Sequence, residues 1–424
     1  MENKTFTTTL PCGIGFAFKR SYSEVAYCAL TIKSGTRNES GYGNGTAHFT
    51  EHLLFKGTQG KSAEAINNCI ERSGGELNAF TTKEETVIHA TLLKDELPKC
   101  AALLMELAFK SLFRENDIET ERNVIIDEIQ SYKDSPPETI YDHFEELLFE
   151  GTDLAPQILG SIRSVKAIKK KDIDGYVKEN FRFENTVLSI VADIDCKKAL
   201  GIATRAASKC GLTPDGIITG ASAGLCPTRP HILCRELKEG KTFDLTLNKR
   251  NHQANCIIGC TGYPIGAEKE RIALILLCNI LGGPAANSVL NMRLREKNGW
   301  VYGVDASYTP YTDNGAVAIS FGCDKEKIDR CIAEISSILG KFREKPISDS
   351  LLKAAKKQLK GQLLISSDNG EQKCISIGKN LLFFGTDADE SKAQEILDGL
   401  VPHDITACAN EIFAPERLSR LIYI

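Results

Sequence analysis

Two of the chain's seven histidines lie one helical turn apart in the stretch "HFTEHLLFKGT", residues 48–58. On a helix, positions i, i+3 and i+4 share a face, so His48, Glu51 and His52 project together. Two imidazoles at this spacing can bind one zinc ion, and a carboxylate beside them can act as a base instead of as a ligand. Asn44 can cap such a helix and Gly57 follows its end, which predicts about three turns. The pattern indicates a hydrolytic zinc site.

Catalytic zinc usually has three protein ligands, so a third must come from another element. The segment "IETERNVIIDEIQ", residues 118–130, has a helical pattern in which Val124 and Ile125 are expected to face the core. Carboxylates on the same stripe are costly to bury unless they are paired or bind a metal. The spacing alone leaves four candidate ligands: Glu119, Glu121, Glu128 and Glu138. A lone HxxEH also arises by chance, and a histidine near a glutamate is more often an ordinary core or surface residue.

The elements that must position these residues belong to an internal duplication. "LLFEGTD" at 147–153 returns as "LLFFGTD" at 381–387, and "FRFENTVLSIV" from Phe181 is similar to "FAPERLSRLIYI" from Phe413. We therefore expect two homologous domains, 1–218 and 231–424, joined by a linker at 219–230 that is rich in small residues, glycine and proline. Adjacent strand patterns mixed with long helical patterns predict an α+β class, each domain having a mainly antiparallel sheet with helices on one face.

The composition indicates which kinds of partner and which cellular compartment to expect. The 424 residues include 52 basic and 56 acidic side chains, for a net charge of −4, which gives no electrostatic reason to expect nucleic acid or an anionic membrane. The longest apolar run, "IALILLCNIL", is about half of the roughly 20 residues that a membrane span requires. Fifteen cysteines without a CxxC indicate reduced thiols. These features predict a soluble, cytoplasmic chain without a membrane span.

The motifs together carry a family resemblance. HxxEH reverses the HExxH of other zinc peptidases and resembles the inverzincins of the pitrilysin family, which includes insulysin-like and mitochondrial-processing-peptidase-like enzymes. The similarity continues through "GGELNAFTTKEET", "ERNVIIDEI", "LGG" and "LREKNGWVYGV". It implies a zinc endopeptidase with one Zn²⁺ per chain, held by His48, His52 and Glu128. Glu51 would then be the base, and Glu121 would support the ligands.

The second half has no HxxEH, and the resemblance gives it another use. Arg295 and Tyr302 in "RLREKNGWVY" resemble an arginine and a tyrosine that bind substrate and stabilise the tetrahedral intermediate. Members of this size pair two chains into a clamshell that encloses a chamber. The resemblance therefore implies a homodimer with shared sites, with a heterodimer containing a zinc-free relative as the alternative.

Peptide substrates are expected to add to the edge of the strand in "ELNAFTT", around Asn78, Ala79 and Phe80, with little sequence preference. The loop "EGTDLAPQILG", residues 150–160, departs from many relatives because it lacks a histidine after the threonine, so the substrate preference does not carry over. The rival hypothesis is a non-catalytic peptide-binding or assembly subunit of the same fold. Intact HxxEH and Glu128 argue against it.

Overall fold

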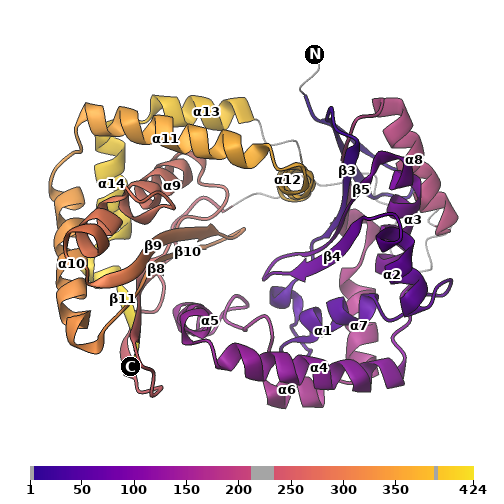
Figure 1. The fold of residues 1–424 in the computed structure, drawn as a ribbon, viewed down its shortest axis with the longest axis horizontal. Coiled ribbons are helices and arrows are strands. Elements are labelled where there is room, and N and C mark those ends of the chain that lie inside the picture. Colours follow the sequence, from indigo (N-terminus) through magenta and orange to yellow (C-terminus); the bar gives the residue numbers. More distant parts are fainter. Residues whose placement is uncertain (1–3, 212–233, 386–389) are drawn as a thin grey trace. The chain divides into compact units, whose positions relative to one another are not determined.

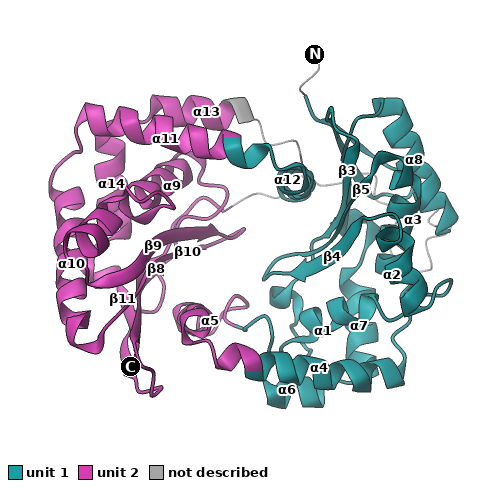
Figure 2. Cartoon of the chain, in the orientation of Figure 1, with its two compact units in different colours: residues 1–130, 156–231, 365–388 teal, residues 131–155, 232–364, 389–424 magenta. Residues whose placement is uncertain are grey.

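The computed structural model describes residues 4–211, 234–385 and 390–424 (Figure 1). The chain forms two compact units (Figure 2). Unit 1 comprises residues 1–130, 156–231 and 365–388, and unit 2 comprises residues 131–155, 232–364 and 389–424. Each unit contains one sheet packed with helices, which confirms the predicted α+β class. The predicted linker, 219–230, lies outside the described residues.

Unit 1 is built on a six-stranded sheet with the order β1-β2-β6-β3-β5-β4. Only the β2–β6 pair is parallel, so the sheet is mainly antiparallel as predicted. The strands are β1 Phe6–Thr9, β2 Gly15–Arg20, β3 Val25–Ile32, β4 Glu76–Thr81, β5 Thr86–Leu93 and β6 Thr186–Ala192. The helices are α1 Thr46–Leu54, α2 Ala63–Glu71, α3 Leu97–Lys110, α4 Glu115–Lys133, α6 Ile162–Ala167, α7 Lys170–Asn180, α8 Cys196–Lys209 and α12 Gly370–Phe384.

Both faces of this sheet are buried, whereas the sequence predicted helices on one face only. Alternate strand residues point to opposite faces. Leu30 and Ile88 pack into the larger core with α3 and α8, whereas Ala29 and Val87 pack against α12. Helix α12 approaches closely because it carries Gly378, at which a Cβ atom would lie 2.9 Å from the Ser189 hydroxyl oxygen. The prediction failed because this second cover comes from the other half of the sequence.

Unit 2 repeats the plan with a five-stranded sheet of order β7-β11-β8-β10-β9. Its strands are β7 Asp244–Leu247, β8 Ala254–Thr261, β9 Val301–Pro310, β10 Gly315–Cys323 and β11 Ser419–Tyr423. Its helices are α5 Pro136–Leu148, α9 Glu268–Gly282, α10 Ile328–Glu344, α11 Asp349–Ser367, α13 Glu390–Gly399 and α14 Pro402–Ile412, with a π-helical segment at Asn291–Lys297. Ile140, Phe144 and Leu148 of α5 cover one face of the sheet.

The two sheets show the predicted repeat at the level of strand pairing. Strand β6 pairs parallel to β2 and antiparallel to β3, and β11 pairs parallel to β7 and antiparallel to β8. Helices α5 and α12, which end at the two copies of the repeated heptapeptide, are exchanged between the units. The compact units therefore differ from the continuous domains 1–218 and 231–424. Those bounds stay a prediction about the homologous halves.

No helix in the described ranges is long and apolar enough to cross a membrane. The cysteines in these ranges are free thiols.

Candidate metal centre

Helix α1 carries the HxxEH residues and is anchored by its apolar side. Phe49 and Leu53 are fully buried, which leaves His48, Glu51 and His52 on the face that points towards α4 and β4. The helix has nine residues, fewer than predicted, and Asn44 does not cap it. The N-cap position is occupied by Gly45, which has a left-handed conformation and no side chain with which to cap the helix. The Glu39 carboxylate accepts hydrogen bonds from the first backbone N–H groups instead.

Helix α4 supplies the carboxylates opposite these imidazoles. An oxygen of Glu128 lies 3.5 Å from His52 Nε2 and 3.8 Å from His48 Nε2. Glu121, two turns earlier, is 3% exposed, accepts from His52 Nδ1 at 3.2 Å and pairs with the Lys56 ammonium at 2.6 Å.

The other two candidate ligands are not grouped with the imidazoles, and one predicted core residue is exposed. Glu119 is exposed and pairs with Arg122 of its own helix, and Glu138 is exposed on α5 in unit 2. Val124 is 46% exposed and does not face the core, whereas Ile125 is fully buried. The buried stripe is narrower than expected, so Glu128 keeps a side chain that is 43% exposed.

The donor set fits a zinc ion. His48, His52 and Glu128 each offer one ligand atom, and these atoms lie within 4.8 Å of one another. A tetrahedral ion with bonds of about 2.0–2.2 Å separates its ligand atoms by roughly 3.4 Å, close to the two measured nitrogen–oxygen distances. Within the described ranges this is the only such group of three or more potential ligands.

The two imidazoles differ in protonation in the metal-free protein. Burial, reinforced by the neighbouring His52, lowers the pKa of His48 to about 4, so this imidazole is neutral at pH 7. Burial also opposes charge on His52, but hydrogen bonds to Glu128 and Glu121 outweigh it and raise its pKa. The bond to Glu121 holds a proton on Nδ1, and a metal ion at Nε2 would take the place of the second proton, which Glu128 stabilises in the metal-free protein.

Glu51 has the environment of a base rather than a ligand. Burial raises the pKa of its carboxyl, against a hydrogen bond with Thr81 at the end of β4. Its Oε2 is buried and has no hydrogen-bond partner in the described part of the chain. A desolvated carboxylate with a free oxygen beside a metal-binding group can accept a proton from water.

Comparison with known proteins agrees with this geometry. Residues 16–161 match the family model described as insulinase, peptidase family M16, and residues 167–359 match the model described as the peptidase M16 inactive domain. The chain belongs to the M16 peptidase family. This is the family that contains pitrilysin and insulysin, so the resemblance drawn from the motifs is confirmed.

The M16 assignment extends along the chain. An uncharacterised zinc protease of Bacillus subtilis is 28% identical over 397 residues, covering 92% of this chain and 91% of its own. The beta subunit of the mitochondrial-processing peptidase of Saccharomyces cerevisiae is 28% identical over 417 residues, covering 96% and 88%. A protease structure from Helicobacter pylori shares the fold, with a TM-score of 0.86, 19% identity and full coverage of both chains.

The predicted peptide-binding residues of this M16 chain lie on an edge strand. β4 is the last strand of its sheet and pairs only with β5 among the described strands. Asn78 is exposed, while Ala79 and Phe80 are half-buried. An unpaired strand edge can accept an extended peptide through main-chain hydrogen bonds.

Arg295 and Tyr302 lie in unit 2. Arg295 belongs to the π-helical segment and is 3.9 Å from Glu296, an ion pair that leaves its side chain 54% exposed. Tyr302 is the second residue of β9 and is 66% exposed. Both side chains are accessible for a role in substrate binding.

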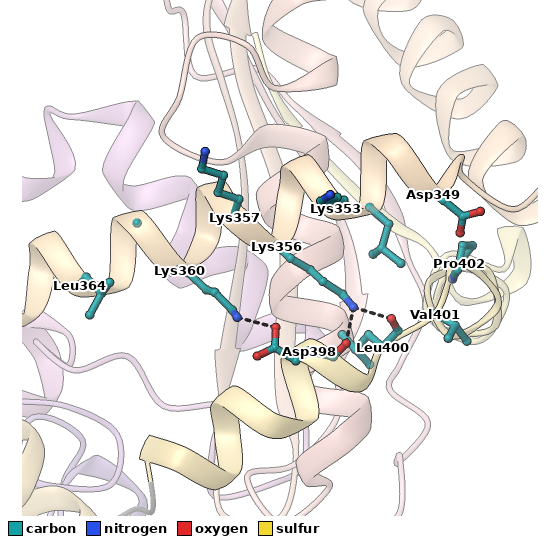
Figure 3. Close-up of a pocket in the computed structure, with 12 residues that line it drawn as sticks. Asp349, Lys353, Lys356, Lys357, Lys360, Leu364, Asp398, Leu400, Val401 and Pro402 are labelled. Carbon is teal, nitrogen blue, oxygen red and sulfur yellow. Dashed lines mark hydrogen bonds and ion pairs between the residues drawn. The ribbon is translucent and has the colours of Figure 1, made fainter.

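A cavity of about 700 Å³ is lined by residues of unit 2 (Figure 3). It lies between α11 and the turn from α13 to α14, and four lysines of α11 line it. Lys356 donates to the carbonyls of Asp398 and Leu400 at the end of α13, and Lys360 pairs with the Asp398 carboxylate. These lysines satisfy a helix terminus, which is a structural task.

Sequence reasoning missed three supporting residues: Glu39, Lys56 and Thr81. Lys56 follows α1 on the face of His52, so its i+4 spacing was a usable signal. Thr81 acts across a tertiary contact, and Glu39 bonds backbone amides six and eight residues later in the chain, a separation that follows no helical spacing rule.

Proposed function

We propose that this chain is a zinc-dependent endopeptidase that hydrolyses peptides or unfolded segments within an enclosed chamber. The observation that carries the proposal is the convergence of His48, His52 and Glu128 beside the buried, partly unpartnered carboxylate of Glu51. Relatives named zinc proteases support the same conclusion.

His48, His52 and Glu128 would hold the ion, and zinc would supply Lewis-acid polarisation of the scissile carbonyl. Glu51 accepts a proton from the attacking water and donates it to the leaving amine. Its pKa, raised by burial, lies closer to neutral pH, which favours transfer in both directions. Glu121 holds the proton on His52 Nδ1 and so fixes the ring's orientation.

The substrate would add to the free edge of β4, with Asn78, Ala79 and Phe80 offering main-chain groups and pockets. Such binding depends on hydrogen bonds to the main chain of the peptide more than on contacts with its side chains, so we expect little preference for particular peptide sequences. Arg295 and Tyr302 would come from the partner in a homodimer or, in the alternative assembly, from a zinc-free relative. We place the activity in the cytoplasm, on composition alone.

The test is digestion of a peptide mixture from a denatured protein, with products read by mass spectrometry. The zinc-loaded wild type should cut internal bonds, and Glu51→Gln, with equal zinc content, should not. A zinc-loaded, dimeric wild type that leaves every peptide intact would favour the rival, a non-catalytic peptide-binding subunit.

A further inference from the structure

Glu39 is a buried carboxylate in the loop before the metal-binding helix. The residue is 5% exposed. Its Oε1 accepts hydrogen bonds from the N–H groups of Gly45 at 3.1 Å and Ala47 at 2.8 Å. Oε2 also lies 3.1 Å from the Gly45 nitrogen. The first N–H groups of a helix have no carbonyl partner within the helix. Glu39 therefore caps the N-terminus of α1, which the N-cap residue Gly45 cannot do because it has no side chain.

The loop that carries Glu39 is fixed to the turn between β4 and β5. Thr36 N donates to the Thr82 carbonyl at 3.2 Å, and Arg37 N donates to the Lys83 carbonyl at 3.0 Å. The packing is close, since a Cβ atom on Gly35 would lie 2.5 Å from the Lys83 carbonyl carbon. Glu39 thus connects the start of α1 to the hairpin whose edge strand is β4.

Charge around Glu39 is balanced within the same unit. Lys83 is 4% exposed, donates to the Pro156 carbonyl at 3.0 Å and attracts the Glu39 carboxylate. Burial raises the pKa of Glu39 to about 8, against the opposing hydrogen bonds of the Ala47, Gly45 and Thr46 amides. The group is therefore largely protonated at pH 7, and the cap rests on its acceptor oxygens rather than on a full negative charge.

The first turn of α1 is also held from a second side. Gly45 has φ +92°, and a Cβ atom there would lie 2.8 Å from the Leu159 carbonyl oxygen. Gly160 has φ +67°, and a Cβ atom there would lie 2.4 Å from the Asn44 carbonyl oxygen. The backbone at Leu159 and Gly160 thus packs against one side of this turn, and the Glu39 side chain holds the turn through its amides. His48 follows directly after the capped Ala47 amide, so any shift of that turn moves the imidazole.

We propose that Glu39 is a positioning residue for the metal centre. Its side chain holds the first turn of α1 against the β4–β5 hairpin and so fixes the position of the imidazoles. This inference rests on the proposed function, because it requires that His48 and His52 bind a metal. Glu39 is not one of the three candidate ligands, and its oxygens bond the backbone amides of Gly45 and Ala47. Its loss should therefore weaken metal binding through a displaced helix.

The experiment compares Glu39→Gln, Glu39→Asp and Glu39→Ala with the wild type. Zinc affinity is measured by chelator competition, and the visible absorption of the Co²⁺-loaded protein reports the ligand geometry. Glu39→Ala should bind zinc about 10-fold more weakly or worse, as for other supporting residues of metal sites. Glu39→Asp should resemble it, because the shorter side chain withdraws the oxygens. Glu39→Gln keeps one acceptor and should lose less.

Glu85→Ala is the matched control, since Glu85 is 4% exposed, is paired with Lys379 of α12 and makes no bond to α1. It should stay within twofold of the wild type. Unchanged affinity and Co²⁺ spectra in Glu39→Ala, or in the Asp and Gln variants should Ala not fold, would overturn the inference. An equal loss in Glu85→Ala would overturn it too. A wild type without zinc affinity would instead refute the metal centre itself.

Discussion

Glu121→Gln offers a graded test of how the protein supports its metal ligands. Glu121 bonds His52 Nδ1 through one oxygen at 3.2 Å and the Lys56 ammonium through the other at 2.6 Å. A glutamine can satisfy only one of these donors, because its second polar atom is an NH₂ group. Lys56 has a side chain that is 36% exposed and can turn to water, so the carbonyl should remain with His52. The variant then loses the charge but keeps the orientation of the ring.

We expect zinc to bind about 10-fold more weakly to Glu121→Gln and about 100-fold more weakly to Glu121→Ala, or about 1.4 and 2.8 kcal/mol. The assay is chelator competition at constant pH. Glu119→Gln is the control, since Glu119 lies on the same helix but is exposed, and its carboxylate pairs with Arg122 rather than with a metal-binding residue. An affinity of folded Glu121→Ala within twofold of the wild type would refute the supporting role.

Four further predictions concern catalysis, packing, pH and assembly. Glu51→Gln should keep zinc and lose turnover by about 10²–10⁴-fold, as measured by peptide hydrolysis and metal analysis. Leu381→Asp, on the buried face of α12, should lower the melting temperature far more than a surface change, and an unchanged value would refute the exchanged packing. Burial lowers the pKa of His143, whose Nδ1 lies 2.9 Å from the Tyr423 hydroxyl, so this residue stabilises the fold above its unfolded pKa and that contribution is lost as pH falls. His143→Gln should flatten the fall in melting temperature between about pH 7 and pH 5, and a parallel fall would exclude this source. Glu51→Gln and Tyr302→Phe, each inactive alone, should recover about a quarter of wild-type activity when mixed as dimers, and a stable mixed dimer without recovery would remove the shared-site model.

The sequence predicted the parts of the site that follow from helical spacing. His48, Glu51 and His52 share a face because the i, i+3, i+4 rule is local, and the same rule set Glu121 two turns from Glu128. The repeated heptapeptide likewise predicted the repeat that the strand pairing displays.

The remainder depended on tertiary contacts. The pattern of α12 indicates that Ile377 and Leu381 are buried, but periodicity cannot say which sheet covers them. The cap of α1 comes from Glu39 through backbone amides, which have no side-chain signature in the sequence. Val124 was misplaced because the buried stripe of α4 is narrow and the helix borders solvent there.

The most direct test of the central claim is a crystal structure of the zinc-loaded wild type with anomalous data collected on both sides of the zinc absorption edge. The account predicts one strong anomalous peak per chain, about 2.0–2.2 Å from His48 Nε2, His52 Nε2 and a Glu128 oxygen, with Glu51 beside it but not bound. A peak at other side chains, or none at this group in zinc-containing crystals, would contradict it.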